Sequence, residues 1–86
     1  MEFEHRIVAE RILGRPLGKG EVVHHINGQR TDNKARNLCV MPRRDHDRYH
    51  SWYRRTCRAQ RQAPTRVSQL NQLRENFNGT LLMTRV

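Results

Sequence analysis

Four of the five histidines fall between positions 24 and 50. His46 and His50 are four residues apart, so on a helix their side chains leave the same face, one turn apart. His24 and His25 are adjacent, so on an extended strand they point to opposite sides. One of this pair can therefore join His46 and His50 at a metal ion while its neighbour stays free. Three imidazoles leave coordination positions open on the ion, which is typical of a catalytic rather than a closed structural site.

The free neighbour is suited to proton transfer, because neutral imidazole can accept a proton from water near neutral pH. The chain also has 17 Lys and Arg against 8 Asp and Glu, giving a net charge of +9 at pH 7. Seven arginines and only two aspartates lie between positions 43 and 61. Taken alone, such a run fits a solvated helix face as well as a phosphate-binding surface. A metal, a base and a basic surface together favour metal-assisted phosphodiester hydrolysis.

The surrounding sequence predicts a small α+β domain that positions these groups. Asn27-Gly28 indicates a turn, and Pro42 suits the first turn of a helix. Trp52 is predicted to anchor the core rather than to stack on bases. Residues 80–86 are apolar and fit a strand, a packed tail or a dimer contact. Apolar periodicity and turn residues predict elements in the order helix 3–13, strand 21–23 leading into His24, strand 38–41, helix 42–60 and helix about 65–77.

A chain of 86 residues has room for one domain at most, with a thin core that a metal ion would help to stabilise. It has no run of the ~20 apolar residues that a membrane span needs, and its first residues do not resemble a signal peptide. We therefore expect a soluble, cytoplasmic protein. Neither Cys39 nor Cys57 belongs to a CxxC pair, so we expect neither to bind metal. His5, which lies among glutamates, is expected to be a surface residue.

The spacing of these residues resembles that of the HNH endonuclease family. Asn37-Leu38 follows His25 by twelve residues, His46 follows Asn37 by nine, and His50 comes four later. The stretch HRIVAERILGRPLGKGEVVHHINGQRTDN looks like the phage and homing branch of that family. The resemblance covers roughly residues 5 to 50. It implies a ββα-metal fold, in which a hairpin and a helix surround one divalent ion. Here flanking N- and C-terminal helices would complete a single domain over residues 1–86, with its core motif at 21–60.

The resemblance also implies a role for each matching residue. His24 matches the first metal ligand and His25 the general base. Asn37 matches the asparagine that braces the hairpin loop and helps to orient the base. His46 matches the second ligand, and His50 the further histidine one turn on. Many relatives have carboxylate or asparagine ligands that suit magnesium, whereas three histidines favour zinc, nickel or manganese. We expect zinc to bind, and manganese, nickel or magnesium are candidates for supporting activity.

The function implied is that of a metal-dependent DNA endonuclease, encoded by a phage or prophage. A single site cuts one strand at a time, so a monomer should nick double-stranded DNA, and a double-strand cut would need a homodimer or two visits. The ends would carry 5′-phosphate and 3′-hydroxyl groups. Because the chain has no room for a separate DNA-reading module, we expect weak sequence preference. The basic residues that flank the ligands, and are expected to contact phosphates, are Arg30, Lys34, Arg43 and Arg44.

The competing hypothesis is a non-catalytic module that binds nucleic acid and is stabilised by zinc. In that case His24, His46 and His50 would hold a structural ion, and His25 would have no catalytic role. Structural zinc sites usually include cysteines, which are not suitably placed here. Asn37 would also have no purpose in a pure binding module. An RNA nuclease stays open as well, because phosphate contacts do not distinguish DNA from RNA.

Overall fold

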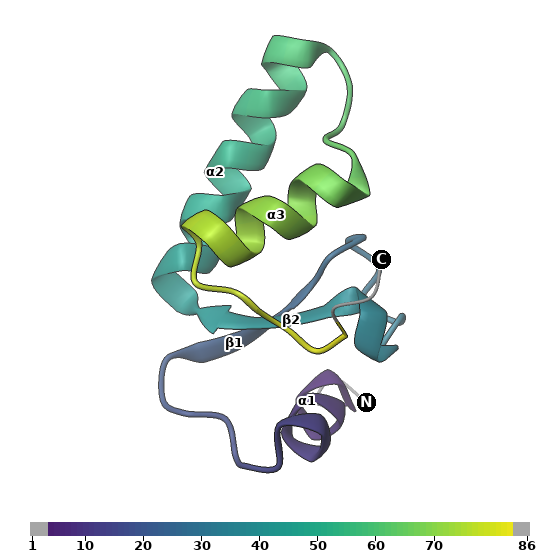
Figure 1. The fold of residues 1–86 in the computed structure, drawn as a ribbon, viewed down its shortest axis with the longest axis vertical. Coiled ribbons are helices and arrows are strands. Elements are labelled where there is room, and N and C mark those ends of the chain that lie inside the picture. The colour runs from purple at the N-terminus through teal and green to yellow at the C-terminus, as the bar shows by residue number, and fades with distance from the viewer. Residues whose placement is uncertain (1–3, 84–86) are drawn as a thin grey trace.

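The computed structural model describes residues 4–83, which form helices on both sides of an antiparallel sheet (Figure 1). The strand order in the sheet is β1-β2-β3. A hairpin of β1 and β2 leads directly into α2, which is the predicted ββα arrangement. The elements follow one another as α1 (Glu4–Leu13), β1 (Glu21–His25), the 3-10 turn η1 (Ala35–Asn37), β2 (Leu38–Pro42), α2 (Arg43–Gln60), α3 (Arg66–Asn76) and β3 (Thr80–Leu81).

The β1–β2 hairpin sets which way each histidine of the adjacent pair points. His24 lies opposite Cys39 and His25 lies opposite Leu38 in the antiparallel register. Directly opposed residues share a face of the sheet, and successive residues alternate between faces. His24 and His25 therefore point to opposite faces, as predicted. The predicted turn after His25 is also present, because the N–H of Gly28 donates to the His25 carbonyl over 3.0 Å and Gly28 has a positive φ of 78°.

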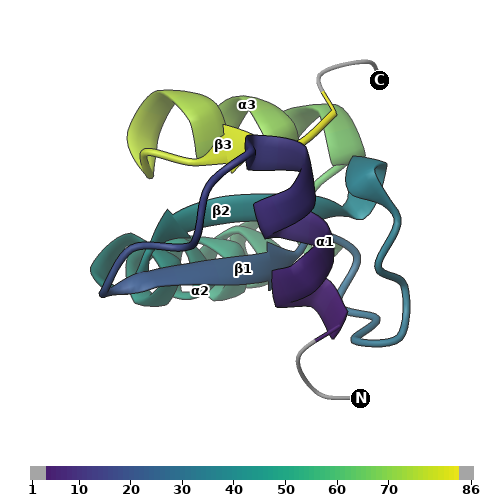
Figure 2. The ribbon, with the colours of Figure 1, turned by 90° about the horizontal axis from the view of Figure 1, so that it is seen from below.

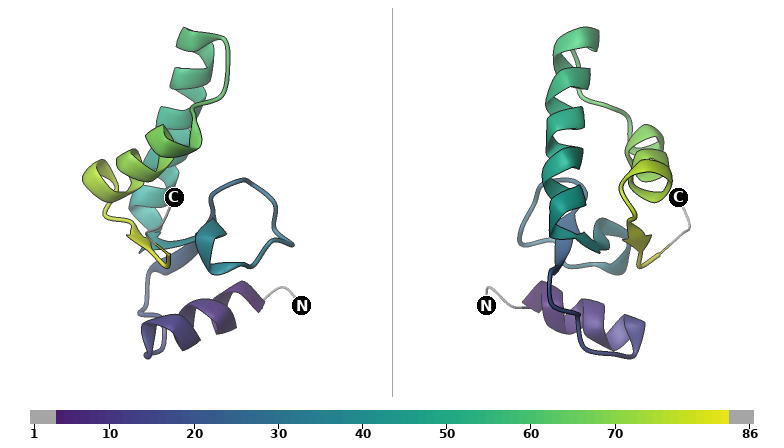
Figure 3. Two further views of the ribbon diagram at one scale, coloured as in Figure 1. Left: turned by 45° about the vertical axis from the view of Figure 1, so that its right-hand side comes forward. Right: turned by 90° about the vertical axis from the view of Figure 1, so that its left-hand side faces the viewer.

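The two faces of the hairpin are covered by different helices. Helix α1 packs on one face, and α2 crosses the other (Figure 2). Figure 3 shows that α3 lies on the same side of the hairpin as α2. The central strand β2 is buried on both faces, because Leu38, Cys39, Val40 and Met41 are all inaccessible to solvent. Because β2 is buried on both faces, apolar side chains pack in two layers, one on each side of the sheet.

The main core lies between the sheet, α2 and α3. Its buried members include Tyr49 from α2, and Leu73 and Phe77 from the α3 segment. Trp52 and Tyr53 pack against this cluster, which confirms Trp52 as a core residue. Thr65 is the N-cap of α3, since its hydroxyl accepts a hydrogen bond from the Ser68 N–H. Among residues 4–83, none of the helices has the length and apolar character of a membrane span.

One detail differs from the sequence prediction, and one alternative that the sequence left open is decided. Pro42 is the last residue of β2 and the N-cap of α2, with an extended ψ of 142°, so it precedes the helix instead of lying in its first turn. Thr80 and Leu81 form a third strand, which pairs with Val40 and Cys39. This pairing decides among the three alternatives for the start of segment 80–86. Its last three residues, like Phe3 at the other end, lie outside the described range.

Candidate active site

His46 and His50 project from the first turns of α2 and meet at their ring nitrogens. Their Nε2 atoms are 3.0 Å apart, and their ring centroids are 4.4 Å apart. This is the contact that the four-residue spacing predicted for a helix. Two unprotonated nitrogens so close together repel each other, so the pair needs either a shared proton or a shared cation.

His24 completes a three-histidine cluster from the neighbouring strand. Its ring centroid is 5.1 Å from that of His46 and 5.3 Å from that of His50. The candidate ligand atoms of the three residues all lie within 4.8 Å of one another. For comparison, two nitrogens on one tetrahedral zinc ion are roughly 3.3 Å apart. Small side-chain rotations would therefore bring all three nitrogens onto one ion.

The environment of His24 indicates that the cluster fits a cation. His24 is only 6% exposed, and within residues 4–83 its buried Nε2 atom has no hydrogen-bond partner. A buried polar atom of this kind costs free energy unless something binds it. Burial, reinforced by the neighbouring His46 and His50, lowers the pKa of His24 to about 3. Burial and His50 also lower the pKa of His46. Both rings are thus held in the neutral form that metal binding requires.

Tyr49 forms the apolar wall behind the cluster. Its ring contacts His24 edge-on, with 4.9 Å between ring centroids, and lies 5.8 Å from His50. The Tyr49 hydroxyl donates to the Gln69 side chain on α3, and burial raises the pKa of this phenol. The phenol therefore stays protonated at neutral pH. Tyr49 shapes the site and links it to the core without offering the ion an anionic oxygen.

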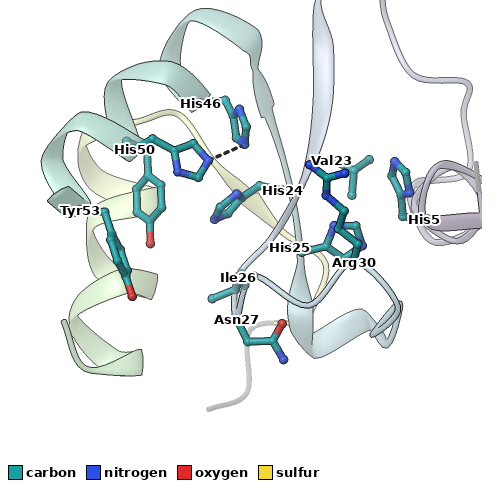
Figure 4. A pocket seen from close by; sticks show the side chains of 12 residues that line it. His5, Val23, His24, His25, Ile26, Asn27, Arg30, His46, His50 and Tyr53 are labelled. Atoms are coloured by element: carbon teal, nitrogen blue, oxygen red, sulfur yellow. Dashed lines mark hydrogen bonds between the residues drawn. The ribbon is translucent and has the colours of Figure 1, made fainter. Parts of the chain in front are cut away.

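His25 lies on the other face of β1, among residues from α1 and the hairpin loop (Figure 4). Its Nε2 atom is 2.8 Å from the Oδ1 atom of Asn33. The amide nitrogen of Asn33 in turn donates to the carboxylate of Glu4. On the adjacent side, the His5 ring meets the His25 ring edge-on at a centroid distance of 5.1 Å. The His25 ring is thus contacted by Asn33 and His5, and Glu4 holds Asn33 in turn; none of these side chains belongs to the histidine cluster.

Asn37 is buried and holds the hairpin loop together. Its Oδ1 atom accepts from the Asn27 N–H over 2.9 Å, and its Nδ2 atom donates to the Asp32 carbonyl over 2.8 Å. Its backbone carbonyl also accepts from the N–H of Ile26, the residue that follows His25. The side chain of Asn37 makes no hydrogen bond to the His25 ring among the described residues. Any effect on that ring therefore passes through the loop backbone.

One pocket of about 630 Å³ joins the histidine cluster to His25. That volume lies within the usual range for ligand sites, which is roughly 300–1,000 Å³. Of the four basic residues predicted to contact phosphate, Arg30 lines the pocket. Lys34, Arg43 and Arg44 are exposed but do not line it. Arg43 is nevertheless close enough to help lower the pKa of His46.

Several residues of the site were not predicted. Asn33 follows the hairpin turn in the sequence TDN, and only its polar character pointed to a role. No sequence pattern pointed to Glu4 or His5. Each contacts a residue that lies more than fifteen positions away in the sequence, namely Asn33 for Glu4 and His25 for His5. His5 was expected at the surface, yet it is half-buried and lines the pocket. A helix face alone could not show that α1 packs on the side of the hairpin where His25 lies.

The cysteines lie outside the cluster. Neither Cys39 nor Cys57 belongs to the group of candidate ligands found in residues 4–83. Cys39 is fully buried in the core, and burial raises the pKa of its thiol to about 12. A thiol with such a pKa stays protonated at neutral pH and binds metal poorly. Cys57 is half-buried further along α2.

A family model described as HNH endonuclease matches residues 2–48, slightly more than half of the chain. The match contains His24, His25, Asn37 and His46, and it ends just before His50. No curated protein and no solved structure matches the chain.

Proposed function

Because the chain belongs to the HNH endonuclease family, we propose that it is a metal-dependent endonuclease that hydrolyses phosphodiester bonds in double-stranded DNA. Membership indicates a nuclease or nucleic-acid-binding role. The observation that carries the catalytic proposal is the shared pocket. It is lined by a histidine cluster whose buried His24 nitrogen has no hydrogen-bond partner in the described part of the chain and, from the other face of β1, by a separate histidine outside that cluster.

His24, His46 and His50 would hold one divalent ion. HNH domains usually bind such an ion, and the three nitrogens fit one here. Neutral imidazoles suit zinc, nickel or manganese better than magnesium, so we expect zinc to bind. The ion that supports turnover is to be found among zinc, manganese, nickel and magnesium. When bound, it supplies Lewis acidity that stabilises the negative charge developing on the phosphate and the leaving oxygen.

His25 would be the general base. It accepts a proton from water as the water oxygen forms a bond to phosphorus and the bond from phosphorus to the 3′-oxygen breaks. The leaving 3′-oxygen takes a proton from solvent. The products then carry a 5′-phosphate on one side of the break and a 3′-hydroxyl on the other. Asn37 would support this step at a distance, because its hydrogen bonds with Ile26, Asn27 and Asp32 fix the loop that begins at His25.

DNA would be held by its phosphates more than by its bases. Arg30 lies in the pocket, where its guanidinium suits the phosphate next to the scissile bond. Lys34, Arg43 and Arg44 are exposed around it and would extend the contact along the backbone. Such contacts carry no direct sequence information, so weak sequence preference follows. With one site per chain, a monomer nicks, and a double-strand break requires a homodimer or two successive visits.

Cleavage of supercoiled plasmid tests this function. The protein is stripped of metal, and magnesium, manganese, nickel and zinc are then added back separately, with wild type beside His25→Ala. We expect wild type to yield open circles with at least one ion and His25→Ala to yield none. Arg74→Ala, an exposed change on α3, serves as the control for altered charge. A plasmid that wild type retards on a gel but leaves uncut with every ion would support the zinc-stabilised binding module instead. A duplex RNA substrate of equal length decides between DNA and RNA.

A further inference from the structure

Three side chains from distant segments form a continuous hydrogen-bonded row that ends at His25. Glu4 comes from the first turn of α1, Asn33 from the hairpin loop, and His25 from the end of β1. The Asn33 amide nitrogen donates to the Glu4 carboxylate, and the Asn33 Oδ1 atom lies 2.8 Å from His25 Nε2. Asn33 is thus the middle member, using its donor on one side and its acceptor on the other.

The row determines where the proton of the His25 ring lies. A carboxylate only accepts hydrogen bonds, so the NH₂ group of Asn33 must face Glu4. The Asn33 oxygen therefore faces His25, and because it too only accepts, Nε2 of His25 must carry the hydrogen. In a neutral imidazole one nitrogen carries hydrogen and the other is an acceptor. The acceptor in this ring is accordingly Nδ1.

We propose that Glu4 and Asn33 are positioning residues that hold His25 as the Nε2-protonated tautomer and leave Nδ1 to accept the proton of the attacking water. This inference rests on the proposed function, since it assigns the proton-accepting atom of the general base. Helix α1 contributes two residues to this arrangement. Glu4 anchors the row, and His5, the next residue of α1, meets the His25 ring edge-on and limits its rotation.

Asn33 and Asn37 stabilise different parts of the same loop. Asn37 bonds to backbone groups of Asn27 and Asp32, so it fixes the path of the chain. Asn33 bonds to the His25 ring itself, so it fixes the proton and the plane of that ring. Losing the outer partner that orients a metal-binding histidine typically costs roughly 10–100-fold in metal affinity or activity, and we expect a similar range for a histidine that acts as a base. We expect Asn33→Ala to lower kcat within that range and to leave KM nearly unchanged, because Asn33 is not expected to touch DNA. Glu4 is exposed, so Glu4→Ala should have a smaller effect in the same direction.

A matched exchange of the two polar groups gives a sharper test. Asn33→Asp places a second carboxylate against Glu4, which should repel it and break the row. Adding Glu4→Gln restores one donor facing one acceptor, since the new amide can donate to the new carboxylate. The double variant should therefore cut faster than Asn33→Asp alone. Equal rates for these two variants would overturn the row as the cause.

The tautomer of the His25 ring can be measured independently of cleavage activity. In the zinc-loaded chain, long-range nitrogen–proton NMR spectra of the histidine rings distinguish the two neutral tautomers. We expect His25 to be protonated at Nε2 in wild type and to become a mixture in Asn33→Ala. Unchanged zinc affinity would show that Asn33→Ala still folds. A wild-type ring protonated at Nδ1, or an Asn33→Ala variant with wild-type kcat and spectrum, would overturn the proposal while leaving the nuclease function standing. A wild type that cuts no nucleic acid with any ion would instead remove the proposed function, and the catalytic part of this inference with it.

Discussion

The side-chain amide of Asn78 donates a hydrogen bond to Oδ2 of Asp45 over 3.1 Å. Asp45 is buried in the first turn of α2, immediately before His46, and its other oxygen accepts from Arg48. Asn78 follows α3, beyond the part of the chain that matches the family model. The C-terminal segment thus braces the helical turn that carries part of the histidine cluster.

Asp45→Asn is expected to destabilise the fold and to weaken zinc binding together. The substituted side chain keeps its shape, but its NH₂ group must face Asn78 or Arg48, which are both donors. The hydrogen bond from Asn78, aided by that from Arg48, also holds the pKa of Asp45 below its usual value, so the carboxylate is charged at neutral pH. Thermal unfolding with and without zinc measures both effects. Asp47→Asn, on the exposed side of the same turn, should be nearly neutral. Equal midpoints for the two variants would contradict the bracing role.

The contact between His46 and His50 was predictable because its spacing is local, whereas the choice of His24 over His25 as the third member came from the family resemblance. His46 and His50 share a helix face by periodicity alone, and the opposite directions of His24 and His25 follow from strand geometry. The hairpin and both long helices were also close to their predicted limits. In each case the pattern lies within one element or across one turn.

The contacts that cross the fold could not be predicted. Asp45 belongs to an arginine-rich run and looked like a surface charge, yet Asn78 and Arg48 satisfy it in the interior. Residues 80 and 81 are too short a strand to show period-two alternation, and only the open edge of β2 makes them pair. The row from Glu4 through Asn33 depends on how α1 docks, which no local pattern encodes.

Gly79→Ala should destabilise the protein through overpacking. A Cβ atom at position 79 would lie 2.6 Å from the Cys39 sulfur and 2.9 Å from the Leu73 carbonyl oxygen. Both neighbours are held in the core, so the backbone must shift, at a cost of roughly 1–3 kcal/mol in the free energy of unfolding. Urea unfolding measures the loss. Gly18→Ala is the matched control, because its Cβ would meet only the side chain of Glu21. If both variants unfold at the same urea concentration, the close packing at Gly79 is not limiting.

Removal of one cluster histidine should weaken metal binding far more than removal of His25. His50→Ala leaves two imidazoles, so zinc affinity should fall by more than the roughly 10–100-fold that loss of an outer partner costs. His25→Ala should keep an affinity close to that of wild type, because His25 is not among the clustered ligand atoms. Competition with a chromophoric chelator measures both constants. A large loss in His25→Ala with little change in His50→Ala would reverse the assignment of the two kinds of histidine.

The metal-free protein should lose stability as pH falls from 6.5 towards 3. In the unfolded chain His24 takes up a proton at its ordinary pKa of 6.5, whereas burial delays this in the folded protein to about 3. Between these values the unfolded state binds more protons, so acid favours unfolding, by at most about 1.4 kcal/mol per pH unit for one group. The lowered pKa values of His5 and His46 add to the same trend. Denaturant titrations at several pH values across this range give the free energy of unfolding at each pH. This free energy should fall less steeply with decreasing pH for His24→Gln than for wild type. Parallel slopes would show that another group is responsible.

Neutralising Arg43 and Arg44 together should reduce the salt dependence of DNA binding. Both side chains are exposed where α2 begins, and Arg43 already acts electrostatically on His46. Each lost phosphate contact on duplex DNA lowers the slope of log affinity against log salt by about 0.9. Fluorescence anisotropy over several salt concentrations, in a His25→Ala background that prevents cleavage, measures this slope for Arg43→Gln/Arg44→Gln. Arg11→Gln/Arg74→Gln removes the same charge from exposed positions on α1 and α3 and should weaken binding without a comparable change of slope. Identical slopes in the two double variants would show that the start of α2 does not touch the DNA backbone.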